Sequence, residues 1–232
     1  MLSLSVVIPT YNERDNIAVL LDQLISQLPS ITGAYEIIVV DDASPDGTAA
    51  VIEQYAKNNS AVRLMQRTGK RDLSTALALG FDSAVGEYVA AMDADLQHDP
   101  VILLQMLAAA SSADLVVATR YAEQGHVVNW SYTRRLLSRA ATSLVSAVLD
   151  ASCSDPLSGY FLLRRDIWQL VRSQLHLSGF KLLLEIMAAK PDISCAEVGY
   201  CFVARQRGKS KFGMMAACDF CLALWRLQGK SR

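Results

Sequence analysis

The chain of 232 residues lacks any uninterrupted apolar stretch that approaches the ~18–20 residues needed to span a membrane. Its first nine residues carry no basic segment and run directly into a strand-like pattern, so we expect no signal peptide. The formal net charge is only −1, which removes any bulk electrostatic argument for binding nucleic acid. Because 52% of the residues are hydrophobic and neither a repeat nor a linker interrupts them, the composition favours a globular domain with a large core.

Two nucleotide-binding signatures and a disulfide framework are also missing. Neither Gly-x-Gly-x-x-Gly nor Gly-x-x-x-x-Gly-Lys-Ser/Thr follows the first predicted strand, so neither a dinucleotide fold nor a phosphate loop is indicated. The five cysteines are scattered, which fits a reducing cytoplasm. Cys218 and Cys221 form a Cys-x-x-Cys, but they lie in an apolar helical stretch without a second pair or a nearby histidine. This context favours buried thiols over a redox or zinc site.

Apolar strand patterns alternate with helical ones along the first half of the chain. The predicted strands cover residues 4–9, 35–41, 61–66, 88–92 and 114–119. Helical spacing follows at residues 17–28, after Gly47, over residues 73–84 and from about Pro100, with Asn12 or Asp15 as the expected cap of the first helix. Continuous apolar strands in this alternation predict an α/β fold, with a mostly parallel sheet covered by helices on both faces.

The fourth strand runs into a cluster of acidic and polar side chains. Asp93 and Asp95 are separated by one small residue, so in an extended chain both carboxylates point the same way. Two such carboxylates suit Mg²⁺ or Mn²⁺, usually shared with the phosphates of a substrate. The alternative is a polar turn in which Asp99 caps a helix that opens at Pro100.

Polar residues follow the other strands as well, at the edge where ligands of parallel sheets bind. They are Tyr11, Asn12 and Glu13 after the first strand, Asp41, Asp42 and Asp46 after the second, Gln97 beside the acidic pair, and Arg120 after the fifth. A turn is a sufficient explanation for Asp46 with Gly47, and any single cluster fits an ordinary solvated loop. Because several clusters converge on one edge, we expect a binding site there.

These residues resemble the family 2 glycosyltransferases with the GT-A fold, a Rossmann-like fold of nucleotide-diphospho-sugar transferases. Within that family they resemble the polyprenol-phosphate (dolichol-phosphate) mannose synthases. The similarity runs through VVIPTYNERDNI, IIVVDDASPDGT, AAMDADLQHDP, VVATRY, DPLSGYFLLRR and FVARQRGKSKFG. The segments DADLQHDP and ARQRGKSK are the more specific ones. The stretch GKRDLSTA at residues 69–76 departs from the pattern, because mannose synthases tend to carry a more glycine-rich segment there.

The resemblance implies a role for each of these positions. It assigns the metal to Asp93, Asp95 and Gln97, and catalysis to Asp93, Asp95 and Arg205. The implied nucleotide-sugar residues are Pro9, Tyr11, Glu13, Asp41, Asp42, Lys70, Asp93, Arg205 and Lys211. The implied acceptor-phosphate residues are Arg120, Arg134 and Ser138, of which the last two share one face of a helix. Solvated arginines are the alternative for Arg205, Arg120 and Arg134.

Two further segments match the family less decisively. Asp155, Ser158 and Gly159 match its Asp-Pro-x-Ser-Gly turn, and a position near the sugar or metal competes with plain turn formation. Residues 121–130 are polar, contain a glycine and are long enough for a mobile lid.

Two amphipathic segments suggest contact with a membrane surface. Residues 132–149 and residues 212–232 mix arginine or lysine with leucine, valine, methionine and tryptophan, which suits a bilayer interface as well as it suits a core helix. We therefore expect a GT-A domain over residues 1–211 and a C-terminal amphipathic helix over residues 212–232. The expected location is the cytoplasmic face of a membrane, bound peripherally, with a membrane-anchoring partner protein as one source of attachment.

The expected activity is transfer of a hexose, with inversion, from a nucleotide sugar to polyprenyl phosphate. The donor favoured by the resemblance is GDP-mannose, with Mg²⁺ or Mn²⁺ as cofactor. The alternative within the class is UDP-glucose or another UDP-sugar. The alternative from a different class is a catalytically silent scaffold that binds nucleotide sugar, which the like-charge repulsion of an intact acidic pair argues against.

Overall fold

All five predicted strands are present, each within one residue of the expected bounds. The computed structural model of the protein describes residues 3–122, 125–128, 138–139, 141–143, 145, 153–177 and 182–203. The predicted strands correspond to β1 (Ser3–Thr10), β2 (Ala34–Asp41), β3 (Val62–Gln66), β4 (Tyr88–Ala91) and β5 (Leu115–Thr119). Their β-branched and apolar sequences therefore mark real strands, as the alternation predicts.

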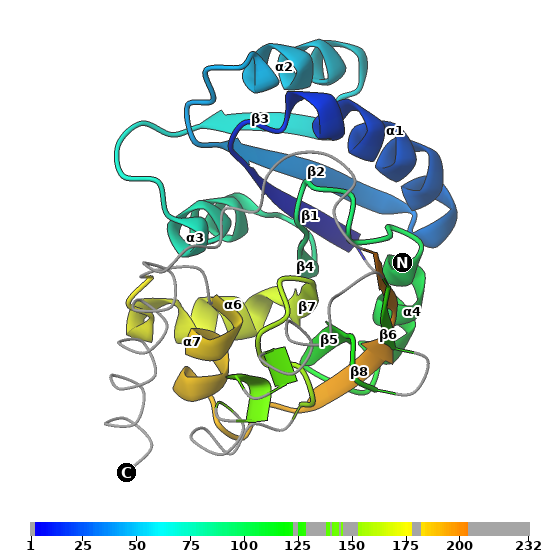
Figure 1. The fold of residues 1–232 in the computed structure, drawn as a ribbon, viewed down its shortest axis with the longest axis vertical. Coiled ribbons are helices and arrows are strands. Elements are labelled where there is room, and N and C mark those ends of the chain that lie inside the picture. The colour runs from blue at the N-terminus through cyan, green and yellow to red at the C-terminus, as the bar shows by residue number, and fades with distance from the viewer. Residues whose placement is uncertain are drawn as a thin grey trace.

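Within the described residues, these strands belong to one sheet of seven, in the order β3-β2-β1-β4-β7-β5-β8 (Figure 1). The sheet is mostly parallel, as expected, and β8 (Cys195–Gly199) extends it beside β5. The strand β7 (Phe161–Arg164) was not expected from the pattern, and it is antiparallel to both of its neighbours, β4 and β5. The strands β6 (His126–Val128) and β9 (Cys201–Val203) form a separate parallel pair.

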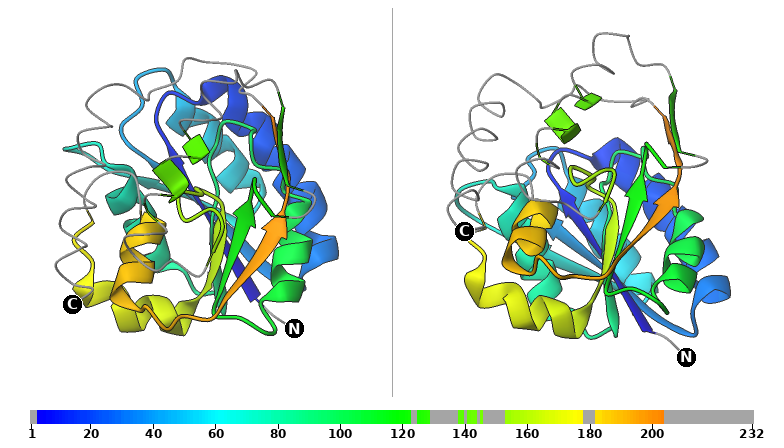
Figure 2. Two further views of the ribbon diagram at one scale, coloured as in Figure 1. Left: turned by 60° about the horizontal axis from the view of Figure 1, so that its bottom comes forward. Right: turned by 90° about the horizontal axis from the view of Figure 1, so that it is seen from below.

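Helices cover both faces of the sheet (Figure 2). One face packs against α1 (Arg14–Ile31), α2 (Thr48–Asn58) and α4 (Ile102–Ala109). The other face packs against α3 (Leu73–Ser83), α6 (Arg165–Val171) and α7 (Leu182–Ala189), with the short 3-10 helix η1 (Arg172–Gln174) after α6. This arrangement of layers confirms the predicted α/β architecture.

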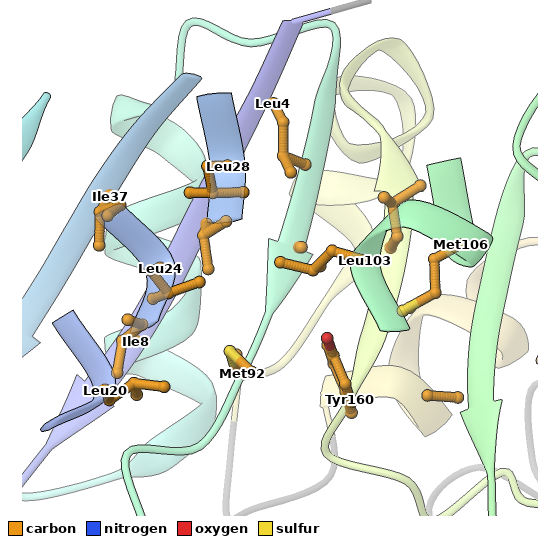
Figure 3. Close-up of a cluster of buried hydrophobic side chains, with 14 of the residues drawn as sticks. Leu4, Ile8, Leu20, Leu24, Leu28, Ile37, Met92, Leu103, Met106 and Tyr160 are labelled. Atoms are coloured by element: carbon orange, nitrogen blue, oxygen red, sulfur yellow. The ribbon is translucent and has the colours of Figure 1, made fainter. Parts of the chain in front are cut away.

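The two cores follow from the alternation of side chains along the strands. Leu4, Val6 and Ile8 of β1 point into the core under α1, while Val7 points to the opposite face, toward α3. Figure 3 shows the first core, in which Leu20, Leu24 and Leu28 of α1 lie beside Ile8 and Ile37, and Leu103 and Met106 of α4 complete the layer. Since both faces are buried, a strand slipped by one residue would exchange the two cores, and the register is therefore strongly specified.

The topology gathers chemistry at one edge of the sheet. The parallel strands β1, β2, β4, β5 and β8 all end there, where ligands of such sheets bind. Because β7 runs the opposite way, it begins at this edge, with Phe161 opposite Ala91 and Val117. The turn that precedes β7, residues 155–160, is thereby delivered to the same edge as the acidic segment after β4.

The expected helix caps need correction. The N-cap of α1 is Glu13, without a side-chain cap bond, and neither Asn12 nor Asp15 takes that role. Asn12 has left-handed backbone, with φ of 55°, and its N–H donates to Ser44, because the chain must turn sharply out of β1. The Asp99 carboxylate accepts from the N–H of Val101 at 3.0 Å, so it caps the turn at Pro100, although α4 itself begins at Ile102.

Several expectations fall outside the described residues. These are the sites at Arg134, Arg205 and Lys211, the Cys218–Cys221 pair, residues 212–232 and most of residues 132–149. Cys153, Cys195 and Cys201, which are described, are free thiols. In the expected lid at residues 121–130, the described residues 126–128 form β6. Among the helices that the structure describes, none combines the length and the apolarity required to cross a membrane.

Candidate active site

The acidic segment begins immediately after β4, at the ligand-binding edge of the sheet. Met92 continues the strand for one residue by donating its N–H to the carbonyl of Val7. The chain then turns, and Leu96 takes left-handed backbone with φ of 62°. Asp95 is 9% exposed, and its carboxylate accepts from the N–H of Gln97 at 3.1 Å. A non-glycine residue in this conformation is costly, and such conformations concentrate at functional sites.

Asp93 is the more accessible of the two acids, with a side chain 40% exposed. It packs closely against Gly159 of the turn before β7. A Cβ at that glycine would lie 3.0 Å from Asp93 Oδ2 and 3.6 Å from its Cγ. The backbone of residue 159 therefore forms one wall of the space that holds the carboxylate. The family turn that includes Gly159 thus lies beside Asp93, and its expected position near the sugar or metal stays a prediction.

His98 contacts the same acid, and the sequence analysis did not single it out. Its ring is 3% exposed, Nδ1 accepts from the N–H of Asp93 at 3.1 Å, and Nε2 lies 3.9 Å from Asp93 Oδ2. Tyr160 stacks on the ring with a centroid separation of 4.8 Å. The available signal was a lone histidine inside DADLQHDP, but burial against aromatic rings from distant strands is not readable from the sequence.

Arg120, after β5, and Asp155, in the turn before β7, form a buried ion pair. Arg120 Nε donates to Asp155 Oδ2 at 2.7 Å and Nη2 donates to Oδ1 at 2.8 Å. Asp155 is fully buried and the Arg120 side chain is 11% exposed. Burial alone would lower the pKa of Arg120, but the hydrogen bonds and charge of Asp155 outweigh it and raise that pKa. The Arg120 guanidinium is therefore held in one orientation and stays positively charged.

Tyr200 connects this pair to the acids. Burial raises the pKa of Tyr200 well above its ordinary value. The charged groups that act on its hydroxyl are Arg120, Asp155, Asp93 and Asp95. The four charged groups therefore all act on one buried tyrosine that directly follows β8, and their roles in binding stay predictions.

Asp41 organises the loops that follow β1 and β2. It lies opposite Thr10 in the parallel register and is fully buried. Its carboxylate accepts from the Thr10 hydroxyl at 3.0 Å, from the Ser44 hydroxyl at 2.5 Å and from the Ser44 N–H at 2.9 Å. These hydrogen bonds tie the loops after β1 and β2 to the buried Asp41 carboxylate. The expected contact of Asp41 with a nucleoside stays a prediction. Pro9 lies one position earlier in β1, opposite Val40.

Asp46 has a larger role than the simple turn expected for it. Its carboxylate accepts from the Thr48 N–H at 3.0 Å and the Thr48 hydroxyl at 2.6 Å, and also from the N–H of Arg14 at 3.2 Å. Thr48 in turn accepts from the N–H of Glu13. The loop after β2 therefore caps α1, and the buried Glu13 carboxylate is left to accept from the Asn16 side chain at 2.8 Å.

A basic group borders the same loops. Arg67 pairs with Asp42 at 2.5 Å and also donates to the Thr75 hydroxyl and the carbonyl of Asp72. The guanidinium of the exposed Arg71 lies 4.2 Å from the centre of the Tyr11 ring, a cation–π contact. Lys70 is exposed in the adjoining turn. The segment that departs from the family pattern thus forms a defined basic loop, because Asp72 caps α3 through the N–H of Thr75.

The described part of the expected acceptor site connects Arg120 with Ser138. Tyr121 places its ring 5.3 Å from the Arg120 guanidinium carbon, and its hydroxyl hydrogen-bonds Ser138 at 2.9 Å. Two of the three residues expected to hold the acceptor phosphate are therefore joined through one side chain. Tyr121 itself was not predicted as a site residue.

The residues at the acidic edge fit a magnesium or manganese ion that a substrate helps to bind. Asp93 and Asp95 offer carboxylate oxygens and Gln97 an amide oxygen, all hard ligands. Because residue 159 is a glycine, no side chain occupies the space beside the Asp93 carboxylate. Within the described part of the chain, no three acidic, histidine or cysteine side chains form a complete protein-only metal site. Such a set suits an ion whose remaining ligands are phosphate and water.

The fold is of the GT-A type, and comparison with known proteins gives the family. Residues 5–171 match the family described as Glycosyl transferase family 2. The chain belongs to that family, as its motifs predicted.

Curated relatives narrow the resemblance further. A dolichol-phosphate mannosyltransferase of Pyrococcus furiosus is 34% identical over 97% of this chain and 64% of its own length. One from Saccharomyces cerevisiae is 34% identical over 89% of this chain and 80% of its own length. A polyprenol monophosphomannose synthase of Mycolicibacterium smegmatis is 33% identical over 97% and 87%. The chain thus spans less than two-thirds of the Pyrococcus relative.

Solved structures support the fold alone. Glucosyl-3-phosphoglycerate synthase from Mycobacterium tuberculosis, in complex with Mn²⁺, UDP-glucose and phosphoglyceric acid, superposes with a TM-score of 0.72 at 18% identity, over 98% of this chain and 80% of that one. Mannosyl-3-phosphoglycerate synthase from Rubrobacter xylanophilus gives 0.69 at 19% identity, over 98% and 73%. These similarities confirm the predicted GT-A architecture.

Proposed function

We propose that the protein transfers mannose from GDP-mannose to a polyprenyl phosphate, with inversion at the anomeric carbon, in a reaction that depends on a divalent cation. An oxygen of the lipid phosphate attacks the anomeric carbon as the bond to the diphosphate breaks, and GDP leaves. The product is a β-linked polyprenyl-phosphate mannose. Relatives named dolichol-phosphate mannosyltransferase and polyprenol monophosphomannose synthase, at 33–34% identity, support the substrates.

The observation that carries the proposal is the set of opposite charges around Tyr200. The charges of Asp93 and Asp95 and those of the Arg120–Asp155 pair all act on its buried hydroxyl. Bound Mg²⁺ or Mn²⁺ would supply Lewis-acid stabilisation of the leaving diphosphate, with Asp93, Asp95 and Gln97 as the ligands from the chain. A phosphate acceptor is already anionic at neutral pH, so it requires positioning by cations rather than a general base.

Each remaining residue of the proposal has a defined task. Arg120 and Ser138, with Arg134 outside the described residues, orient the acceptor phosphate. Arg205 and Lys211, also outside them, bind the diphosphate, which a guanidinium can hold through two parallel hydrogen bonds. The donor nucleoside is bound along the loops after β1 and β2, by the set Pro9, Tyr11, Glu13, Asp41, Asp42 and Lys70.

The lipid acceptor also requires the enzyme to reach a bilayer. We propose peripheral attachment at the cytoplasmic face of a membrane, through the amphipathic residues 132–149 and 212–232, with a membrane-anchoring partner protein as a further source of attachment. In this division residues 1–211 form the catalytic domain. Sedimentation with anionic vesicles tests the attachment, and a protein that stays in the supernatant contradicts it.

The test of the reaction is transfer of radiolabelled mannose from GDP-mannose to polyprenyl phosphate by the purified protein, with Mn²⁺, Mg²⁺ or EDTA. We expect a lipid-extractable product only with a divalent ion. Thermal shifts against GDP-mannose, UDP-glucose and UDP-N-acetylglucosamine identify the donor, and transfer from a UDP-sugar alone would replace mannose as the substrate. A protein that binds a donor but transfers from none to polyprenyl phosphate is a binding scaffold, and the proposal is wrong.

A further inference from the structure

One imidazole contacts both the backbone and the carboxylate of Asp93. Nδ1 of His98 accepts the N–H of Asp93 at 3.1 Å, and Nε2 lies 3.9 Å from Asp93 Oδ2. A ring nitrogen that accepts from a backbone N–H carries no proton, so in the neutral ring the proton is on Nε2, the nitrogen nearer the carboxylate. His98 therefore binds the backbone where the chain turns, and its Nε2 lies near the Asp93 carboxylate.

The ring itself is held by aromatic neighbours from other strands. Tyr160 stacks on it at 4.8 Å with the planes 20° apart, and Tyr200 meets it edge-on at 5.9 Å. The Tyr160 hydroxyl donates to the carbonyl of Asp99 at 3.1 Å, which fixes the residue that follows His98. Because the imidazole is only 3% exposed and packed on two sides, it cannot turn away from Asp93 without unpacking the core.

Gly159, in the turn before β7, borders the same carboxylate. A Cβ there would lie 3.0 Å from Asp93 Oδ2 and 3.6 Å from Oδ1. A Cβ–oxygen contact of 3.0 Å is tighter than nine in ten real Cβ contacts, so the carboxylate would have to shift by a few tenths of an ångström. A side chain at residue 159 would therefore press on the Asp93 carboxylate.

We infer that His98 and Gly159 are positioning residues for the acid at residue 93, which together hold its carboxylate in the orientation that a divalent cation and a nucleoside diphosphate require. The inference rests on the proposed function, since it assumes that Asp93 binds the cation. Such outer contacts of metal ligands set the orientation of the ligand, and their loss typically costs about 10–100-fold in metal affinity or activity.

The central test compares His98→Asn with His98→Leu. The side-chain oxygen of asparagine lies about where Nδ1 lies in histidine, so it can accept the Asp93 N–H, whereas leucine fills much of the volume and accepts nothing. His176→Leu is the matched control, because His176 is an exposed histidine distant in sequence from the acidic segment. The wild type and the three variants are each measured at the same number of degrees below their own melting temperature. Differences in global stability then do not affect the comparison.

Three measurements separate positioning from packing. Hydrogen exchange reports the protection of the Asp93 amide, Mn²⁺ titration in the presence of GDP reports metal affinity by electron paramagnetic resonance, and steady-state kinetics report kcat and the KM for GDP-mannose. In His98→Leu we expect loss of amide protection, Mn²⁺ binding weaker by about 10–100-fold, and a fall in kcat. In His98→Asn we expect protection and most of the metal affinity to be retained.

Two results overturn the inference: wild-type Mn²⁺ affinity in His98→Leu, or equal losses in the asparagine and leucine variants. Failure of the proposed function is recognised separately. A wild type that binds Mn²⁺ and GDP but transfers no mannose contradicts the proposed reaction, while the exchange and metal measurements still decide the role of His98.

Gly159→Ala provides an independent test through stability. We expect this variant to bind Mn²⁺ about tenfold more weakly, because the added methyl group displaces the Asp93 carboxylate. In an Asp93→Ala background the methyl group has no carboxylate to meet, so the cost of Gly159→Ala in the free energy of unfolding should largely disappear. Additive costs across this double-mutant cycle would show that Gly159 does not act through Asp93.

Discussion

Arg120 grips Asp155 through two parallel hydrogen bonds, of 2.7 and 2.8 Å, at a point where the carboxylate is fully buried. Arg120 follows β5, and Asp155 begins the turn before β7. The pair therefore joins two segments that the sequence separates by 35 positions. Arg120, which is expected to bind the acceptor phosphate, is thus itself bound by Asp155. Its orientation is therefore set before a substrate binds.

Removal of either member of this pair should destabilise the fold strongly. We expect Arg120→Met or Asp155→Leu to lower the free energy of unfolding by about 3–5 kcal/mol, since each leaves an uncompensated buried charge. The double variant should lose much less than the sum, because it leaves no charge behind. Urea unfolding of the four proteins measures the cycle, and additive losses would contradict the coupling.

Asp95→Ala should abolish transfer while leaving the fold intact. Loss of a cation ligand removes several kcal/mol of transition-state stabilisation, so the activity should fall by at least about a hundredfold. Asp22→Ala is a suitable control, because Asp22 is an acid on α1 that hydrogen-bonds Tyr55 away from the sheet edge. Near-wild-type transfer by Asp95→Ala, with an unchanged circular dichroism spectrum, would rule out the proposed mechanism.

Tyr121→Phe should affect the acceptor more than the donor. The substitution removes the 2.9 Å hydrogen bond to Ser138 but keeps the ring beside Arg120. A typical hydrogen bond contributes about 1 kcal/mol, so we expect the KM for polyprenyl phosphate to rise about fivefold. The KM for GDP-mannose should not change. Equal rises in both constants would place Tyr121 outside the acceptor site.

Asp46 should make stability depend on pH at the acid end. Burial opposes ionisation of this carboxyl, but hydrogen bonds from Thr48 and from the N–H of Arg14 outweigh it and lower its pKa. A lowered pKa in the folded state adds stability above the unfolded value of about 3.9, and that stability is lost as the pH falls through the folded pKa.

The matched variant for this prediction is Asp46→Asn. At neutral pH we expect it to be less stable by about 1 kcal/mol, the usual cost of a lost helix cap. The difference from the wild type should shrink as the pH falls below about 4, where the carboxyl of the unfolded wild type takes up a proton, and it should be lost as the pH passes the lower pKa of the folded state. Unfolding curves at pH 7, 5, 4 and 3 measure it, and a constant difference would contradict the assignment.

Much of the fold was readable because apolar periodicity and strand–helix alternation are local properties. The strand containing Ile8 and the one containing Val39 are continuous apolar runs, and their ends are marked by Asn12 and Asp42. The antiparallel strand β7 was not readable in the same way. Its four residues resemble many short apolar runs, and its partners β4 and β5 are chosen by packing between helices on both faces.

The same difference between local and tertiary features applies to the residues of the candidate site. Asp93, Asp95 and Gln97 could be singled out because a carboxylate pair directly after a buried strand is unusual in the sequence itself. His98 could not, since its importance depends on Tyr160 and Tyr200, which arrive from distant strands. The caps of α1 were predicted wrongly for a similar reason: Asp46 reaches it from the next loop.

The sequence by itself determined the class of fold, the family and the acidic edge, because these depend on residues that are neighbours along the chain. Only the tertiary structure decided that Arg120 is paired with Asp155, that Gly159 borders Asp93, and that His98 orients the same acid. The contacts of Asp155 and Gly159 exist because an antiparallel strand starts where the parallel strands end, and the turn before that strand also brings Tyr160 onto the His98 ring. That juxtaposition is a property of the assembled sheet, and no local pattern encodes it.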